Sequence, residues 1–502
     1  MKEAWLLSRG GEAVLVAAAA AATLLIAVVW QLIRRGRGSC RLPPGPRALP
    51  VVGNLLELMG GELPHRAMAK LSKKYGPIMF LKLGVVPTVV VSDTTFAKAC
   101  LSGPNDKVFC SRPSMEVTRR LAFGQSSGIS MAPYGAEWRH ARKLCSVQLF
   151  TSKRVREFEP IRSGEIMALV RRIELQVGQP LNLTQAIASL SEATICKILL
   201  GKPMAEISDA TLGIDMAMLV RRMIDLFIVP MLGDFIPALG FLDRKLKANL
   251  DEVHAQFDTL ISQLIHERQQ RLPSSPEVIV DVLLENLERE HAKTIIMELM
   301  SASIDSSSTT MDWAMAELVR TPQAMSRLQM ELDCVTKGES RMIKEEELRH
   351  LVYLQAVLKE TMRLHPPGPI LTPRMSIEEC KVGGYIIPKG STLLTNMWAI
   401  GHDPKIWEDP EKFMPERFLT EKGELIDFCG QHFELLPFGT GRRICPGLPL
   451  AIASIQSTLA NLVHSFEWIL PHGHYVNLEE KFGIVSTRAK PLMVIPQMRC
   501  KE

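Results

Sequence analysis

Near the carboxyl end the chain reads Phe438-Gly439-Thr440-Gly441-Arg442-Arg443-Ile444-Cys445-Pro446-Gly447, and this stretch decides the fold class. Residues 448–464 follow it with apolar side chains at helical spacing. Glycines let a flat ligand approach the backbone, and free amides at a helix start favour a thiolate. Arginines bind carboxylates through paired hydrogen bonds. The stretch therefore fits a thiolate ligand to haem iron with arginines near the haem propionates; a glycine-rich turn with a structural cysteine is the alternative.

The pattern Phe-x-x-Gly-x-Arg-x-Cys-x-Gly resembles the haem-binding signature of the cytochrome P-450 superfamily, the haem-thiolate monooxygenases. The matching residues are Phe438, Gly441, Arg443, Cys445 and Gly447. The resemblance implies that Cys445 is the axial metal ligand of haem b and that Arg443 pairs with a propionate. It also implies that Phe438 and Gly447 belong to the cofactor site.

Further stretches resemble the plant microsomal members of this family. They include Pro43-Pro44-Gly45-Pro46 and Phe109-Cys110-Ser111-Arg112-Pro113. In Trp138-Arg139-His140-Ala141-Arg142, the first and last residues share one helical face. The resemblance implies that Trp138 and Arg142 both donate hydrogen bonds to haem propionates. Arg374 is expected to reach a propionate as well.

An internal ion network is expected in addition to the cofactor site. Glu360 and Arg363 are three residues apart in Lys359-Glu360-Thr361-Met362-Arg363, and Arg417 lies in Phe413-Met414-Pro415-Glu416-Arg417-Phe418. Surface Glu/Arg pairs at this spacing are common and contribute little. The resemblance instead implies a structural network of Glu360, Arg363 and Arg417 that locks the core near the haem.

A polar cluster, residues 301–310, interrupts an otherwise apolar helical segment. Buried hydroxyls must bond either backbone carbonyls or a ligand. The resemblance places Asp305 at the family's acid position and Ser306 at its catalytic threonine position, with roles in proton delivery and in a hydrogen bond to bound dioxygen. Ser303 stands where the family has glycine. These departures leave a haem-thiolate isomerase or dehydratase, which needs no reductase, as an alternative; a non-catalytic haem- or ligand-binding membrane protein is another.

The segments that contact substrate in related enzymes are mostly apolar here, which predicts a hydrophobic small-molecule substrate. The residues expected to line its pocket are Leu121, Phe123, Ile129, Ala302, Ile370, Leu371, Ile484 and Val485. By resemblance, the reaction is hydroxylation of a plant specialised metabolite, either a phenolic or flavonoid or a terpenoid.

Composition excludes several other classes. The chain has 502 residues, 46% hydrophobic and 23% charged, with a net charge of +5. So many apolar residues exclude a disordered chain, and so small an excess of positive charge gives no reason to expect nucleic-acid binding. The sequence has no G-x-G-x-x-G dinucleotide motif. Electrons are therefore expected to come from NADPH through a partner flavoprotein, the cytochrome P-450 reductase.

The chain divides into three parts. Residues 13–30 form an apolar run long enough to cross a bilayer, followed by Arg34, Arg35, Arg37 and Arg41. We therefore expect a membrane anchor at residues 1–35, a basic and proline-rich hinge at 36–50, and a catalytic domain at 51–502. A cleaved signal peptide is the alternative. The positive-inside rule predicts that the catalytic domain lies in the cytosol, and a single pass is expected because no other stretch is this long and uncharged. The resemblance to plant microsomal members implies that the membrane is that of the endoplasmic reticulum and that the chain contacts membrane lipid.

The catalytic domain is expected to be mainly α, with a small β-rich lobe. Apolar residues recur at helical spacing in residues 152–177, 242–270, 288–320 and 322–335. Short strands are expected at 78–83, 89–92 and 381–387. A hairpin strand at 392–396 is expected after the turn Pro388-Lys389-Gly390.

Overall fold

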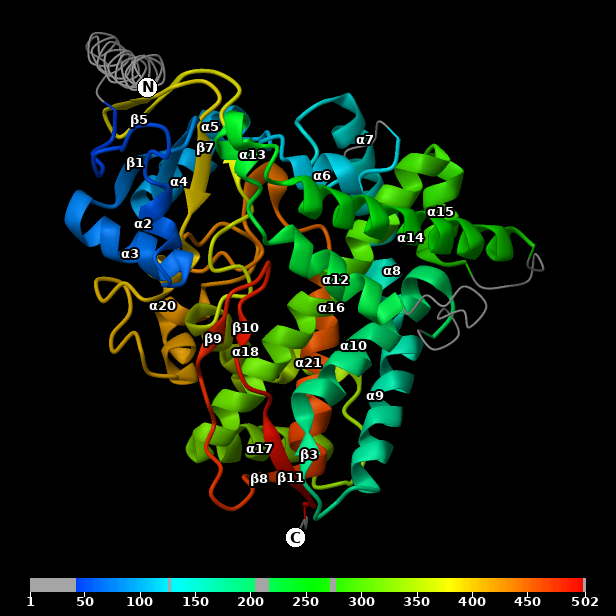
Figure 1. Cartoon of the computed structure of the whole chain (residues 1–502). Helices are drawn as coiled ribbons and strands as arrows, with labels where there is room; N and C mark the ends of the chain where they lie inside the picture. Colours follow the sequence, from blue (N-terminus) through cyan, green and yellow to red (C-terminus); the bar gives the residue numbers. More distant parts are fainter. Residues whose placement is uncertain (1–41, 125–127, 204–215, 271–276, 500–502) are drawn as a thin grey trace, which may run out of the picture.

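The computed structural model describes residues 42–124, 128–203, 216–270 and 277–499. The expected anchor and the first part of the hinge lie outside these residues. Within them the fold is mainly α with a small strand-rich lobe, as expected. Figure 1 shows this lobe, with β1, β5 and β7, on one side of the molecule and the long helices on the other.

The lobe is built on a four-stranded sheet in the order β1-β2-β7-β4. Its strands are β1 (Ile78–Leu83), β2 (Val86–Val91), β7 (Thr392–Thr395) and β4 (Arg374–Met375). Strand β7 runs parallel to β2, with Val89 opposite Leu393, and antiparallel to β4. The hairpin expected at 392–396 is therefore wrong. All four residues of β7 are buried, and a strand covered on both faces belongs in the middle of a sheet.

Smaller elements complete the lobe and the lower end of the molecule. The expected strand at 381–387 is a two-stranded hairpin of β5 (Cys380–Val382) and β6 (Tyr385–Ile387). A second sheet has the order β3-β11-β8, and β9 pairs with β10. These strands are β3 (Leu181–Asn182), β8 (Phe466–Ile469), β9 (Glu480–Lys481), β10 (Thr487–Arg488) and β11 (Met493–Met498).

The helices follow the predicted segments closely. Residues 152–177 hold two helices instead of one, α8 (Ser152–Glu157) and α9 (Glu159–Glu174), because Phe158 ends the first and Pro160 opens the second. The other long helices are α10 (Leu183–Leu200), α12 (Met216–Phe227), α14 (Arg244–Gln269), α16 (Arg289–Arg320), α17 (Pro322–Thr336), α18 (Val352–Leu364) and α21 (Leu448–Ser465). The shorter α-helices are α2 (Leu55–Met59), α3 (Pro64–Tyr75), α4 (Thr94–Leu101), α5 (Gly103–Val108), α6 (Glu116–Leu121), α7 (Ala136–Leu144), α13 (Leu232–Phe235), α15 (Ile279–Asn286), α19 (Met397–Gly401) and α20 (Glu421–Glu424). Single turns of other helix types are η1 (Cys145–Leu149), η2 (Pro237–Leu239), η3 (Glu345–His350), η4 (Pro415–Leu419) and η5 (Gly441–Arg443).

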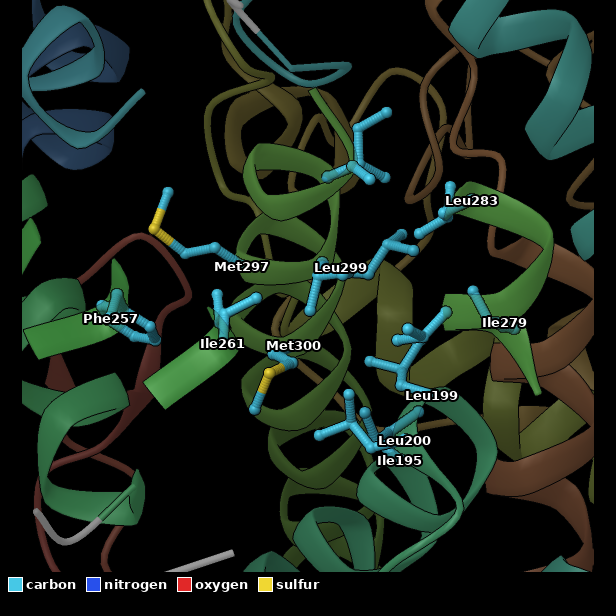
Figure 2. Packing of buried hydrophobic residues seen from close by; sticks show 14 of the residues in the cluster. Ile195, Leu199, Leu200, Phe257, Ile261, Ile279, Leu283, Met297, Leu299 and Met300 are labelled. Carbon is cyan, nitrogen blue, oxygen red and sulfur yellow. The ribbon is translucent and has the colours of Figure 1, made fainter. Parts of the chain in front are cut away.

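Helix α16 is the central helix of the body and packs against α10, α14, α15, α18 and α21. Figure 2 shows Leu199 of α10 and Leu283 of α15 on one side of α16, and Phe257 and Ile261 of α14 on another. These side chains belong to one buried hydrophobic cluster. Burying so many large apolar side chains supplies the main driving force for folding and fixes α16 as a rigid platform.

One described helix, α10, has the length and hydropathy to span a membrane. More than half of its most apolar window is buried, and it packs along α16. It is therefore a core helix.

Candidate active site

Cys445 lies in the turn between η5 and α21. Its backbone N–H donates to Phe438 O at 2.8 Å, which closes the turn. The backbone N–H groups of Gly447 and Leu448, at the start of α21, bond the sulfur and lower its pKa, yet burial outweighs them and raises the pKa of the thiol. The helix start alone therefore does not hold a thiolate here, and a coordinated metal ion would complete the deprotonation.

The Cys445 side chain borders an internal hollow. Protein atoms surround the sulfur closely enough to raise its pKa, and yet the residue keeps accessible surface. On α16, Ala302 is likewise exposed although most of that helix is buried, and Ser303 and Ser306 are partly exposed. The first turns of α21, which pack against α16, are also only partly buried. The accessible surface of the expected metal ligand and of the polar cluster therefore lies among packed helices, and this accessible region is what we call the hollow.

Four arginines converge beside the Cys445 turn, and we call them the arginine cradle: Arg112, Arg142, Arg374 and Arg443. Burial lowers the pKa of each, and that of Arg443 falls to about 10. Arg374 and Arg443 also repel Arg112. Arg374 has an acidic partner, Asp106, at 3.1 Å, and Asp106 also bonds Arg442.

Arg112 and Arg443 of the cradle bond neutral carbonyls. Arg443 donates to Cys110 O at 2.7 Å and to Ala132 O at 2.6 Å. Arg112 donates to Thr372 O at 2.6 Å. Arginine keeps its proton inside proteins, so an unmatched buried guanidinium needs an anion. A ligand with carboxylates is the group that such a cradle fits, and haem with its propionates meets this requirement.

Trp138 and Arg142 lie one turn apart on α7, as expected. The Trp138 indole N–H donates to Ile129 O at 3.1 Å, and the Arg443 guanidinium stacks 4.0 Å above its ring. Arg142 is half-buried and lies close enough to Cys445 for their charges to interact. The helix therefore delivers both side chains to the Cys445 region.

The ion network predicted from sequence is present and fully buried at its centre. Glu360 accepts from Arg363 Nε at 2.7 Å through one oxygen and from Arg417 Nε at 3.0 Å through the other. Both Glu360 and Arg363 side chains have no accessible surface. Arg363 also donates to Pro410 O at 2.8 Å, which links α18 to the loop before η4.

Several hydroxyls of the polar cluster bond backbone carbonyls of α16 itself. Ser306 Oγ donates to Ala302 O at 2.8 Å, and Ser308 Oγ donates to Ile304 O at 2.7 Å. The helix runs without interruption from Arg289 to Arg320, including Ser303 at the family's glycine position. A hydroxyl has one proton and two lone pairs, so Ser306 can still accept a hydrogen bond from a ligand without moving.

Asp305 is a partly buried carboxyl on the same helix. Burial raises its pKa to about 6; Arg221 of α12 opposes this, whereas Glu192 of α10 and Asp225 of α12 add to it. Arg221 itself donates to Glu192 at 3.3 Å. Asp305 is therefore partly protonated near neutral pH and can hold or release a proton.

The expected pocket residues separate into two groups. Leu121, Phe123 and Ile129 are buried in the same hydrophobic cluster as Ile304 of α16. The others keep accessible surface: Ala302, Ile370, Leu371, Ile484 and Val485. Ile370 and Leu371 pack on the clusters of the strand-rich lobe. The first group forms the wall near α16. In the second group Ala302 lies on α16 itself, and the other four residues lie on separate segments.

Two residues of the candidate site were given no role in the sequence analysis. Arg112 lies in a stretch typical of plant members, but nothing in the stretch indicates that its guanidinium joins the cradle. Glu298 of α16 accepts hydrogen bonds from Ile129 N at 2.6 Å and Ser130 Oγ at 2.5 Å. Its position one turn before Ala302, on the same helical face, is the signal that could have found it.

Comparison with known proteins identifies the family. The cytochrome P450 family model matches residues 43–496. The chain belongs to the cytochrome P-450 superfamily. It is 36% identical over 498 residues to the flavonoid 3'-monooxygenase of Petunia hybrida, covering 95% of this chain and 96% of that protein. It is 37% identical over 503 residues to the costunolide synthase of Cichorium intybus, covering 97% and 99%.

A solved structure agrees with the fold. A zebra fish cytochrome P450 with progesterone superimposes with a TM-score of 0.73 at 28% identity, covering 87% of this chain and all of that one. The chain is therefore a plant-type haem-thiolate monooxygenase, an oxidoreductase acting on a small molecule, and its family binds haem through a cysteine thiolate.

Proposed function

We propose that this P-450 hydroxylates a hydrophobic plant specialised metabolite, a phenolic or flavonoid or a terpenoid, and that Cys445 is its axial haem ligand. The observation that carries the proposal is the accessible Cys445 thiol beside four arginines, two of them buried and two half-buried. Relatives named for flavonoid and costunolide chemistry support the two substrate classes. When bound, the haem supplies the activation of dioxygen that no side chain can perform.

The chain's own residues would do the remaining work. Arg443, Arg374 and Arg142 hold the propionates, and Trp138 supports Arg443 through its ring. The apolar wall at Ile129 and Ile304 orients the substrate and excludes water. Ser306 Oγ and the Asp305 carboxyl hold the protons that the reaction consumes.

We propose that electrons come from NADPH through the cytochrome P-450 reductase. Exposed cations lie near the Cys445 side of the molecule: Arg139 and Lys143 on α7, and Arg442 beside the signature. An acidic flavoprotein surface would be attracted to them.

We also propose that the protein is located in the endoplasmic reticulum membrane. Directly after the expected anchor, Val51 and Leu56 are 70% and 62% exposed, and Leu49 and Met59 are also exposed. Val85, in the β1–β2 turn, is exposed too, and its N–H bonds Phe235 O. Apolar side chains gathered beside an anchor are suited to contact with lipid.

The first measurement is the difference spectrum of the reduced protein under carbon monoxide. The intact protein should show a strongly red-shifted Soret band, and Cys445→Ser should lose that band because the thiolate is gone. Cys110→Ser, a buried cysteine of the same region, is the control and should keep the band. An unshifted band in folded wild-type protein would refute the proposed site. Turnover should then require both NADPH and the reductase, since an isomerase would need neither.

Ser306→Ala tests the oxygen side. The variant lacks the hydroxyl that borders the hollow, so oxygen and NADPH consumption should continue while the yield of hydroxylated product per NADPH falls several-fold. Ser308→Ala is the matched control, because Ser308 is buried and bonded to Ile304 O. Unchanged coupling in Ser306→Ala would remove the role given to this residue.

A further inference from the structure

One short segment, residues 128–132, is held from both edges, and we call it the 128–132 segment. On its amide edge, Glu298 of α16 accepts from Ile129 N at 2.6 Å and from Ser130 N at 3.2 Å. The Ser130 hydroxyl also donates to Glu298, at 2.5 Å, and the Met131 N–H faces the same carboxylate. One side chain therefore binds several consecutive donors of a segment far away in sequence.

The carbonyl edge of the same segment faces the arginine cradle. Ile129 O accepts from Trp138 Nε1 at 3.1 Å and from Arg443 Nη1 at 3.3 Å. Ser130 O accepts from Arg112 Nε at 2.9 Å. With a carboxylate at the amides and cations at the carbonyls, the peptide dipoles of the segment are aligned between opposite charges, which strengthens every bond along it.

Gly128 shows how closely the carboxylate approaches. A Cβ added there would lie 2.4 Å from the Glu298 carboxyl group, and Gly128 has a φ of +67°. Glycine alone satisfies both conditions without strain. The entry to the segment is therefore shaped for contact with Glu298.

Glu298 also lies one helical turn before Ala302, on the face of α16 that borders the hollow. It is only partly buried by accessible surface, although surrounding protein raises its pKa. Its negative charge favours the charged forms of both Arg112 and Arg443. Ile129, which it fixes by the backbone, belongs to the apolar wall.

From this arrangement we infer that Glu298 is a positioning residue: it holds the 128–132 segment so that Ile129 forms the substrate wall while the segment's carbonyls fix the cradle arginines. The inference rests on the proposed haem-thiolate function. In this role Glu298 acts through the segment, by its hydrogen bonds to the amides of Ile129 and Ser130. Loss of its carboxylate would loosen the wall next to α16 and leave the iron ligand unchanged.

The first test is amide hydrogen exchange in full-length protein, wild type against Glu298→Gln. Exchange at residues 129–131 should accelerate by about 10-fold or more, the size expected for losing a charge-assisted hydrogen bond. Glu290→Gln is the matched control, because Glu290 lies on the same helix and ion-pairs with Lys293 at its exposed end. Unchanged exchange at 129–131 would overturn the inference whatever haem state the protein has.

The second test separates the wall from the haem. Two probes bind the iron of the holoprotein: imidazole, which needs little space, and 4-phenylimidazole, whose ring must contact the wall. In Glu298→Gln the affinity for 4-phenylimidazole should fall about 10-fold and that for imidazole by less than about 2-fold. Equal losses for both probes would assign Glu298 to general stability and overturn the positioning role.

A second variant guards against misfolding of the first. In Gly128→Ala the added Cβ would displace the Glu298 carboxyl group from the segment. This variant should therefore reproduce both the faster amide exchange and the weaker binding of 4-phenylimidazole. Gly124→Ala is its control, because Gly124 has a similar φ of +61° and an added Cβ there meets nothing closer than 3.4 Å. Equal effects from the two glycine variants would contradict the inference. The carbon monoxide spectrum of the wild type reports on the proposed function separately, so its failure and the failure of this inference are distinguishable.

Discussion

Two groups of buried arginines differ in how their charge is neutralised. In the ion network, Glu360 binds Arg363 and Arg417 through a carboxylate that has no accessible surface. In the arginine cradle, four arginines converge, and the acid bonded to one of them, Asp106, is shared with exposed Arg442. Both network arginines therefore bond a carboxylate directly, whereas among the cradle arginines only Arg374 does.

The difference teaches how to distinguish a structural charge cluster from a binding site. A buried carboxyl without a partner can take up a proton, but a buried guanidinium keeps its charge. Buried arginines that bond no carboxylate of the chain therefore predict an anionic ligand. Buried arginines that share a carboxylate predict a structural role alone. Substitutions in the network should mainly lower the free energy of unfolding. Substitutions in the cradle should mainly speed the dissociation of the ligand.

The largest effect is expected from breaking the network. Glu360→Gln leaves two buried cations without their counter-charge, and removal of one partner of a buried pair costs about 3–5 kcal/mol. The midpoint of urea denaturation should fall sharply, and little folded protein should remain at 37 °C. Glu416→Gln is the control, since Glu416 pairs with half-exposed Arg327 and should cost at most about 1 kcal/mol. Equal losses in the two variants would contradict the contrast drawn here.

A cradle variant should weaken ligand retention more than stability. Arg443→Met removes one unmatched cation, so haem should dissociate about 10-fold faster or more, because a charge-assisted hydrogen bond to a propionate is lost. The urea midpoint of the haem-free protein should fall less than in Glu360→Gln, because Arg443 bonds neutral carbonyls and no carboxylate. Arg442→Met, at the exposed neighbouring position, should change haem dissociation little. Destabilisation of the haem-free protein as large as that of Glu360→Gln would refute the distinction.

The network could be predicted through the family resemblance, and local spacing accounts only for its Glu360–Arg363 pair. Glu360 and Arg363 share one turn of α18, and the helix alone brings them together. The Cys445 turn is also local, and its glycines with positive φ, Gly439 and Gly441, make the bend. Both the fold class and the expected metal ligand were therefore accessible from short stretches.

The cradle could be predicted only in part, because its members meet through backbone carbonyls. Arg112 reaches Ser130 O and Thr372 O, and no side-chain pattern indicates which carbonyls point inward. The same holds for Glu298, whose partners are amides. The parallel pairing of β7 with β2 was missed for a related reason, since the adjacent turn favoured a local hairpin over a distant partner.

Asp305 is a partly buried carboxyl, which can lose its charge by taking up a proton, whereas the cradle arginines cannot lose theirs. Its folded pKa is about 6 against an ordinary 3.8, so the folded state holds the proton more tightly and stability falls as pH rises through this range. The difference corresponds to at most about 3 kcal/mol. Asp305→Asn should therefore match the wild type near pH 4 and exceed its urea midpoint increasingly toward pH 7. A difference that does not change with pH would refute the assignment.

A substitution of Arg221 tests whether Asp305 is the group that titrates. Because Arg221 lowers the pKa of Asp305, Arg221→Gln should raise that pKa further and extend the pH-dependent loss of stability to higher pH. The effect is the smallest of these, since Arg221 is 56% exposed and water screens its charge. It should vanish in the Asp305→Asn background, where no proton remains to titrate. A pH shift that persists in the double variant would show that another group, such as Glu192, carries the proton.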